Sequence, residues 1–290
     1  MINDEASNMQ LHPKILSLLE KRDLRTPEEI HRFLYPDIDH LYNPMLMKDM
    51  DKAVARIRRA IKDGERITVY GDYDVDGITS CCILVKLIKN LGGNVDYYIP
   101  SRVAEGYGLN RGALEKMHSN GTTLIITVDN GIGSFEEVEL AKTIGIDTII
   151  TDHHEPGSLV PDAFAVVNPK QEDCSYPFKS LAGVGVALKL AHALAELDKT
   201  ILEDYLDLAV LGTVADIVPL LDENRIIASE GLKRLQNTKN KGILALASKL
   251  NLSMADIDTG KISFMIAPRL NAVGRIADPN MACELLLTED

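Results

Sequence analysis

Three clusters of acidic or imidazole side chains in this chain each follow a short apolar run. Asp72, Asp74 and Asp76 follow the run 66–70, Asp129 follows 123–128, and Asp152, His153 and His154 follow 146–151. Carboxylates and imidazoles without thiolates favour manganese or magnesium over a sulfur-rich zinc site. The three clusters therefore predict a divalent-metal site, provided that the fold brings them to one place.

Each cluster taken alone has a simpler interpretation. If the backbone stays extended from Asp72 to Asp76, the alternate carboxylates share one face, where they repel one another unless cations hold them. A solvated acidic turn is the alternative. Asp129-Asn130-Gly131 is also an ordinary turn signal. The coincidence of all three clusters at strand ends favours a metal site.

A fourth acid, Asp216, stands alone in the apolar stretch 211–220. A buried unpaired carboxylate is costly, so Asp216 must be paired, protonated or bound to a metal, and a helix cap or an ion pair is an equal alternative. Several carboxylates allow one of them to bridge two ions. Two divalent cations about 3.5–4 Å apart activate water and stabilise charge during hydrolysis of phosphate esters.

The elements that must position these side chains alternate regularly. We expect strands at 66–70, 94–99, 122–128, 146–151 and 163–168, and helices between them at 77–91, 110–118 and 134–143. This alternation predicts an α/β fold, a mostly parallel, doubly wound sheet with helices on both faces. Ligands of such sheets bind at the carboxyl ends of the strands.

A helical segment follows the sheet, with helices expected at 184–196, 200–214, 224–236, 241–250, 261–267 and 279–287. We divide the chain into an N-terminal helical appendage (1–45), an α/β domain (46–220) and a helical extension (221–290). Thr26 before Pro27 is a helix start in the appendage. No breaker closes the last helix, so we expect the chain to be a fragment.

Composition narrows the class of protein. The 290 residues are 46% hydrophobic and 26% charged, with a formal net charge of −12. We find no membrane-spanning run, no signal peptide and no CxxC pair, which favours the cytoplasm. The negative charge argues against a generally basic nucleic-acid surface, so a polyanion would have to be held by metals and a few arginines.

Four motifs together resemble the metal-site motifs of the DHH phosphoesterase superfamily. In order, they are Gly71–Gly77, Val128–Gly131, Asp152–His154 and Gly212–Asp216. Within the superfamily, the stretches 101–108, 181–187 and 267–275 resemble the bacterial single-strand-specific 5′→3′ DNA exonucleases. The resemblance covers about residues 35–290.

The resemblance implies a role for each metal-site residue. Asp74 and Asp129 would hold one ion. The ligands of the second would be Asp76, Asp129, His153 and Asp216, with Asp129 bridging. His154 would face the scissile phosphate and act with Asp129 and Asp76 in catalysis.

Three neighbouring residues would support this centre. Many superfamily members have a histidine where Tyr70 stands, so water or Asp72 would complete the first ion's ligands. Asp152 is a further possible support. The expected cofactors are two divalent cations, with Mn²⁺ preferred over Mg²⁺.

We assign Arg102, Arg269 and Arg275 to phosphate contacts, because a guanidinium can hold phosphate bidentately. Structural ion pairing is the alternative. Asn271 would contact a phosphate oxygen or cap a turn. Tyr107 would stack on a base or pack in the core.

The implied function is degradation of single-stranded DNA from the 5′ end in repair and recombination, with protein partners unknown and no membrane partner. One alternative is a relative that hydrolyses short oligoribonucleotides, cyclic dinucleotides or pyrophosphate. Another is a non-catalytic replication scaffold, which the retained ligands disfavour. The related exonucleases continue into a second core domain and an oligonucleotide-binding fold, so we expect little activity from this chain alone.

Overall fold

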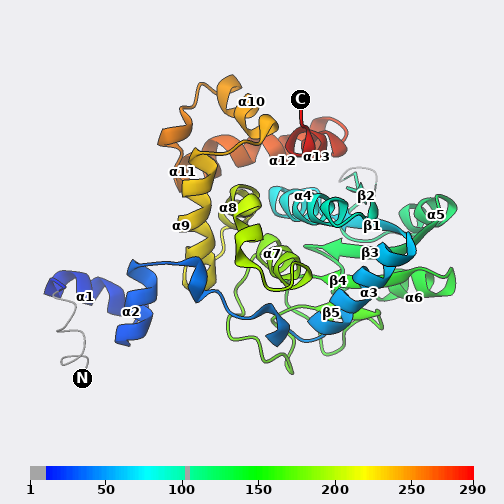
Figure 1. Ribbon diagram of the computed structural model, residues 1–290, viewed down its shortest axis with the longest axis horizontal. Coiled ribbons are helices and arrows are strands. Elements are labelled where there is room, and N and C mark those ends of the chain that lie inside the picture. The colour runs from blue at the N-terminus through cyan, green and yellow to red at the C-terminus, as the bar shows by residue number, and fades with distance from the viewer. Residues whose placement is uncertain (1–10, 102–104) are drawn as a thin grey trace.

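The computed structural model describes residues 11–101 and 105–290. These residues contain a five-stranded sheet in the order β2-β1-β3-β4-β5, and every neighbouring pair is parallel (Figure 1). The strands are β1 (Arg66–Gly71), β2 (Asn94–Tyr98), β3 (Thr122–Val128), β4 (Asp147–Thr151) and β5 (Ala165–Val167). The predicted parallel α/β sheet is confirmed.

Helices cover both faces of this sheet. They are α3 (Met50–Asp63), α4 (Val75–Asn90), α5 (Arg111–Ser119), α6 (Phe135–Thr143) and α7 (Gly183–Leu194). Alternate residues of one strand enter different cores: Leu124 and Ile126 lie in the core with α4 and α7, and Ile125 lies in the core with α5 and α6. Burial on both faces explains why β1, β3 and β4 are largely apolar runs, whereas the edge strand β2 is polar and partly exposed.

The rest of the described chain is helical. After the sheet come η4 (Lys199–Asp204), α8 (Leu206–Ala215), α9 (Asp222–Gln236), α10 (Lys241–Lys249), η5 (Met254–Asp256), α11 (Thr259–Lys261), the π turn η6 (Ile262–Ile266), α12 (Ala267–Ile276) and α13 (Asn280–Leu287). Before it come α1 (Pro13–Glu20), α2 (Pro27–Leu34), η2 (Ile38–His40) and η3 (Pro44–Leu46). Figure 1 shows α1 and α2 at the side of the molecule, next to the end of α9.

Two helix predictions were wrong. The predicted helix 200–214 is a 3-10 helix followed by α8, with Tyr205 between them. The predicted short helix 261–267 instead continues through α12 to Ile276. Pro268 does not end this helix, because it occupies the first turn of α12, where a missing N–H is tolerated.

A buried ion pair joins α7 to α9, and a hydrogen bond from Tyr42 links the segment before the sheet to it. Lys189 Nζ lies 2.9 Å from Glu223 Oε1, and both side chains are buried. Glu223 also accepts the Tyr42 backbone N–H at 3.0 Å and the Tyr176 hydroxyl. The described helices include none that is long and apolar enough to cross a bilayer.

Candidate metal centre

The acidic segment after β1 does not stay extended up to Asp76, so the condition for a common face of its three carboxylates is not met. β1 ends at Gly71, and α4 begins at Val75, two residues earlier than predicted. Asp74 is the N-cap, and its Oδ1 accepts the Gly77 N–H at 3.0 Å. Asp76 lies in the first helical turn and is buried. The capping carboxylate offered the backbone a helix start at a position that alternation alone placed in a strand.

The N-terminus of α7 holds Asp76. Its two carboxylate oxygens accept the N–H groups of Gly183 and Val184, each at 2.7 Å. These are unpaired amides at the positive end of a helix, which stabilise a nearby carboxylate. A Cβ on Gly183 would lie 2.6 Å from Asp129 Oδ1, so glycine lets Asp129 approach the same point. Gly183 therefore allows both close packing and anion binding at the same point.

Asp129 is placed by the end of β3. Its φ of 61° turns the chain immediately after the strand, and its N–H donates to Thr151 O at 3.0 Å. This left-handed conformation is unusual for a side chain other than glycine, asparagine or aspartate. The turn carries the Asp129 carboxylate back towards α7 and β4.

Three buried ligand atoms converge without hydrogen-bond partners. His153 Nε2 lies 3.0 Å from Asp129 Oδ1 and 3.7 Å from Asp216 Oδ2, and among the described residues none of these three atoms makes a hydrogen bond. The same nitrogen lies 3.9 Å from Asp76 Oδ2. Unsatisfied buried polar atoms cost about 1–3 kcal/mol each, a cost that a cation would remove. The donor set therefore fits a divalent ion.

A second set of oxygens adjoins the first. Asp72, Asp74 and Asp129 each offer one oxygen, and these oxygens lie within 4.8 Å of one another; the ligand atoms of Asp76, His153 and Asp216 meet the same limit. Asp129 links the sets, because it belongs to the former and contacts His153 of the latter. The arrangement suits two ions with one bridging carboxylate.

The electrostatics also fit cations. Burial, followed by repulsion from neighbouring carboxylates, raises the pKa of both Asp76 and Asp129. Burial and Asp74 raise the pKa of Asp216 to about 6. Burial and His154 lower the pKa of His153 to about 4, which keeps its imidazole in the neutral form that binds metal.

His154 points to a different role. It is half-exposed, and its Nδ1 lies 2.7 Å from Asp152 Oδ1, so only Nε2 can meet a ligand. Asp152 is fixed in turn by the backbone N–H groups of Ile132, His153 and His154 at 2.9, 2.7 and 3.1 Å. Burial tends to raise the pKa of Asp152, but His154 and these N–H groups lower it overall. Asp152 thus orients His154.

Tyr70 does not take the place of a metal ligand. Its buried hydroxyl donates to Gly108 O at 2.8 Å and accepts from Asn110 Nδ2 at 3.1 Å, and its ring stacks on Tyr98. Tyr107, by contrast, is 54% exposed and not packed in the core. Its hydroxyl lies 3.3 Å from Asp129 O and 3.4 Å from His154 Nδ1.

The predicted phosphate-binding residues separate into three cases. Arg102 lies outside the described residues. Arg269 and Arg275 are exposed on α12. Asn271 Oδ1 accepts the Val75 N–H at 2.9 Å, so it caps α4 beside the acidic segment and keeps only its amide group for a ligand. Capping is one of the two roles expected for Asn271, although the sequence did not indicate that α4 is the helix it caps.

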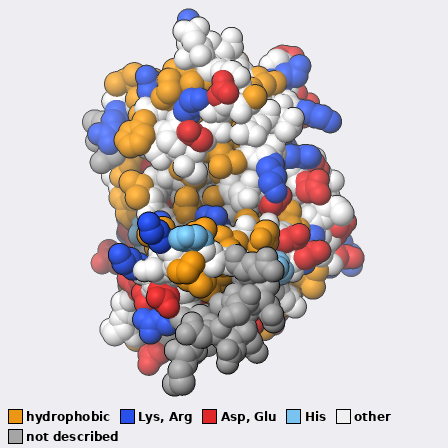
Figure 2. Space-filling model, turned by 90° about the vertical axis from the view of Figure 1, so that its left-hand side faces the viewer, with side chains coloured by type: hydrophobic (Ala, Val, Ile, Leu, Met, Phe, Trp, Pro, Cys, Tyr) orange, Lys and Arg blue, Asp and Glu red, His pale blue; other side chains and the backbone are white. Residues whose placement is uncertain are grey.

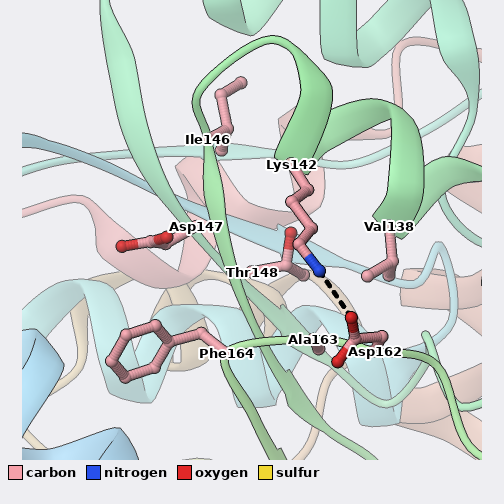
Figure 3. Close-up of a pocket in the computed structure, with 8 residues that line it drawn as sticks. All are labelled: Val138, Lys142, Ile146, Asp147, Thr148, Asp162, Ala163 and Phe164. Carbon is pink, nitrogen blue, oxygen red and sulfur yellow. Dashed lines mark hydrogen bonds and ion pairs between the residues drawn. The ribbon is translucent and has the colours of Figure 1, made fainter.

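Cavities lie at both ends of the parallel strands. One of about 590 Å³ adjoins His154 and Asp152, between Tyr107 and Ser134. Another of about 240 Å³ lies at the opposite ends of the strands, beside Asp147 at the start of β4 (Figure 3). Its Lys142 and Asp162 pair with each other, as the dashed line in Figure 3 marks. His154 and its partner Asp152 therefore line the first of these two cavities and not the second.

Comparison with known proteins gives a consistent family match. The family described as "DHH family, N-terminal domain" matches residues 66–213. The chain is 48% identical over 284 residues to the single-stranded-DNA-specific exonuclease RecJ of Bacillus subtilis, covering 97% of this chain and 36% of that protein. It is 38% identical to RecJ of Escherichia coli, covering 99% of this chain and 52% of that protein. The chain thus spans about a third to a half of the length of these relatives.

Solved structures agree. A crystal structure of exonuclease RecJ bound to manganese has a TM-score of 0.77 at 37% identity, covering 84% of this chain and 62% of that one. RecJ from Thermus thermophilus in complex with Mg²⁺ has a TM-score of 0.66 at 30% identity, covering 94% of this chain and 35% of that one.

Proposed function

The chain belongs to the DHH family, and from that premise we propose that it is the metal-binding part of an exonuclease specific for single-stranded DNA. The reaction is hydrolysis of a phosphodiester from the 5′ end, with release of mononucleotides. The observation that carries this proposal is the convergence of Asp129 Oδ1, His153 Nε2 and Asp216 Oδ2, three buried ligand atoms without hydrogen bonds.

Two divalent cations would occupy the centre. Asp74, Asp129 and Asp72 would hold the first. Asp76, Asp129, His153 and Asp216 would hold the second. When bound, such a pair activates water and stabilises charge on the attacking and leaving oxygens. Manganese suits the second set better than magnesium does, because that set includes an imidazole and magnesium takes oxygen ligands.

Side chains and backbone amides of the protein would position the substrate and the ligand residues. The Nε2 of His154 would contact the scissile phosphate, and Asp152, as its orienting partner, would keep Nδ1 protonated. The α7 amides would hold Asp76 in place whether or not a cation is bound. The cavity between Tyr107 and Ser134 would receive the nucleotide beside His154.

The DNA strand would be held locally rather than by a basic surface. With a net charge of −12, the protein would attract phosphates only where cations or arginines stand. We assign Arg102, Arg269 and Arg275 to this role, with the free amide of Asn271.

The proposed cellular role and domain division are inferred from the relatives. We propose a cytoplasmic role in DNA repair and recombination, and the same division into an appendage (1–45), a catalytic α/β domain (46–220) and a helical extension (221–290). Because the relatives are two to three times longer, strong activity is expected of the longer assembly rather than of these 290 residues alone.

The test is degradation of a labelled single strand by metal-free protein to which Mn²⁺, Mg²⁺ or neither is added. Label at the 5′ end should appear first as mononucleotide, and Asp129→Ala should abolish the reaction. Glu136→Ala, which removes an exposed acid on α6, is the matched control and should be neutral. Equal degradation by Asp129→Ala contradicts the proposal. Faster hydrolysis of a dinucleotide than of a long strand would instead favour the short-oligonucleotide hydrolases.

A further inference from the structure

The helical segment 259–277 has no acidic residue, although the whole chain has 43 acids among its 290 residues. It carries three cations, Lys261, Arg269 and Arg275. Among the described residues, no carboxylate lies within ion-pairing distance of either arginine; Arg269 Nη1 instead donates to Phe264 O at 3.2 Å. In an acidic protein this segment is a local cationic stripe with unused charge.

Phe264 is the most unusual residue of this stripe. Its side chain is 79% exposed, and it lies within the π turn that joins α11 to α12. Within α12, residues three, four and seven positions apart share one face, so Pro268, Asn271 and Arg275 lie roughly in line. Phe264 lies in the π turn just before this face. An exposed aromatic ring therefore immediately precedes a face that carries a cation and a polar amide.

This face leads away from the metal centre. Asn271 binds the first turn of α4, and a Cβ on Gly274 would lie 3.4 Å from Tyr73 O in the acidic segment. Phe264 comes seven residues before Asn271, which is about 10 Å along the axis of a helix. Figure 1 shows α11 and α12 above α8, and Figure 2, which faces the side of the molecule on which α9 and α11 lie, shows hydrophobic side chains among the charged ones on this surface.

We propose that Phe264 is a base-stacking residue on the path of the single strand, beyond the metal centre, with Arg269 and Arg275 contacting phosphates beside it. This inference rests on the proposed function. The charge favours nucleic acid over a protein partner, because a polyanion satisfies both arginines. An aromatic ring among cations is the usual platform for single strands, since every base has a face to stack on.

Binding of oligothymidylate tests the proposal, in an Asp129→Asn background that leaves the strand intact. Loss of one stacked base corresponds to a loss of about 5- to 150-fold in affinity. Phe264→Ala and Phe264→Leu should both show it, whereas Phe264→Tyr should bind like the parent. The matched control is Phe164→Leu, because Phe164 is an exposed phenylalanine at the opposite edge of the sheet (Figure 3). A strand carrying 2-aminopurine at successive positions should show one quenched position, lost in Phe264→Leu and kept in Phe264→Tyr.

The outcomes separate this inference from the proposed function. If Phe264→Leu binds like the parent, the side chain serves apolar packing against another protein segment and the proposal is overturned. It is also overturned if the parent does not bind the oligonucleotide. If the protein with Asp129 intact degrades single strands and Phe264→Ala neither weakens binding nor slows degradation, only the stacking role fails. If the parent binds with the expected quenching pattern but no variant or metal yields hydrolysis, only the enzymatic function fails.

Discussion

Replacing Asp216 by asparagine should make the metal-free protein more stable at neutral pH. Burial and the neighbouring Asp74 raise the pKa of Asp216 to about 6, from an ordinary value of 3.8. A carboxyl whose folded pKa is raised destabilises the folded state once it ionises. The stability that its protonated form provides is therefore lost as the pH rises from about 4 through 6.

The size of the effect follows from the shift. A rise from 3.8 to about 6 corresponds to about 3 kcal/mol, and because the side chain is 24% exposed to solvent, we take about half of this. Metal-free Asp216→Asn should then exceed the wild type by about 1.5 kcal/mol at pH 7.5 and equal it near pH 4. For a chain of this size the difference is about 3 °C in Tm.

Added Mn²⁺ should reverse the order of stability, so that the wild type becomes more stable than Asp216→Asn. With free Mn²⁺ at 100 times its Kd, the wild type gains about 2.7 kcal/mol, whereas a variant whose Kd exceeds the free concentration gains less than about 0.4 kcal/mol. The wild type should then be more stable by roughly 1 kcal/mol. Thermal unfolding of both proteins should be measured near pH 4 and at pH 7.5, each with chelator and with Mn²⁺. These four conditions test the whole prediction.

Asp207→Asn is the matched control. Asp207 is a buried acid outside the metal centre, its pKa is raised by burial, and it binds Thr238 and the Leu208 N–H. Its replacement should leave the gain from Mn²⁺ unchanged. The reasoning is refuted if Asp216→Asn is less stable than the wild type in chelator at pH 7.5, or if it gains as much from Mn²⁺.

Three further predictions concern the supports of the centre. Gly183→Ala should lower Mn²⁺ affinity at least tenfold by calorimetry, because its Cβ would meet Asp129 at 2.6 Å, whereas Gly133→Ala, with open space around it, should bind normally. Asp152→Asn should lower kcat about 10- to 100-fold at saturating Mn²⁺, since the imidazole of His154, proposed to contact the phosphate, loses its orienting partner; an unchanged kcat would contradict this role. Glu223→Gln should cost about 3–5 kcal/mol in urea unfolding, because it leaves a buried ammonium of α7 unpaired, and a cost below about 1 kcal/mol would show that the pair is not needed.

The sheet was predictable because its strands are short, β-branched runs buried on both faces. The run ending at Val128 predicts both the strand β3 and the position of Asp129 at its carboxyl end. Parallel strands then bring their ends to one edge, so Asp129 and His153 meet although they are 24 positions apart in sequence. The ends of the strands thus bring Asp129 and His153 together, whereas Asp76 and Asp216 come from the start of α4 and the end of α8.

The orientation of the acids was not predictable in the same way. Asp74 alternates with Asp72 and Asp76, as side chains on one face of a strand do, but an aspartate at this position can equally cap a helix. Residues 267–276 posed a similar ambiguity, because Pro268 indicates either a break or a first helical turn. Packing against the acidic segment, where Asn271 caps α4, is a tertiary contact that no local pattern contains.

The protein treats its buried acids unequally, and this explains the need for cations. Asp76 receives two amide hydrogen bonds from α7, and Asp152 receives three backbone N–H groups and an imidazole. Asp129 Oδ1 and Asp216 Oδ2 receive none among the described residues. Adding amides to them would have stabilised the metal-free fold but would have occupied the lone pairs that a cation needs. Asp129 and Asp216 therefore remain poorly satisfied by the protein itself, whereas Asp152, which orients a neighbouring imidazole, accepts several hydrogen bonds.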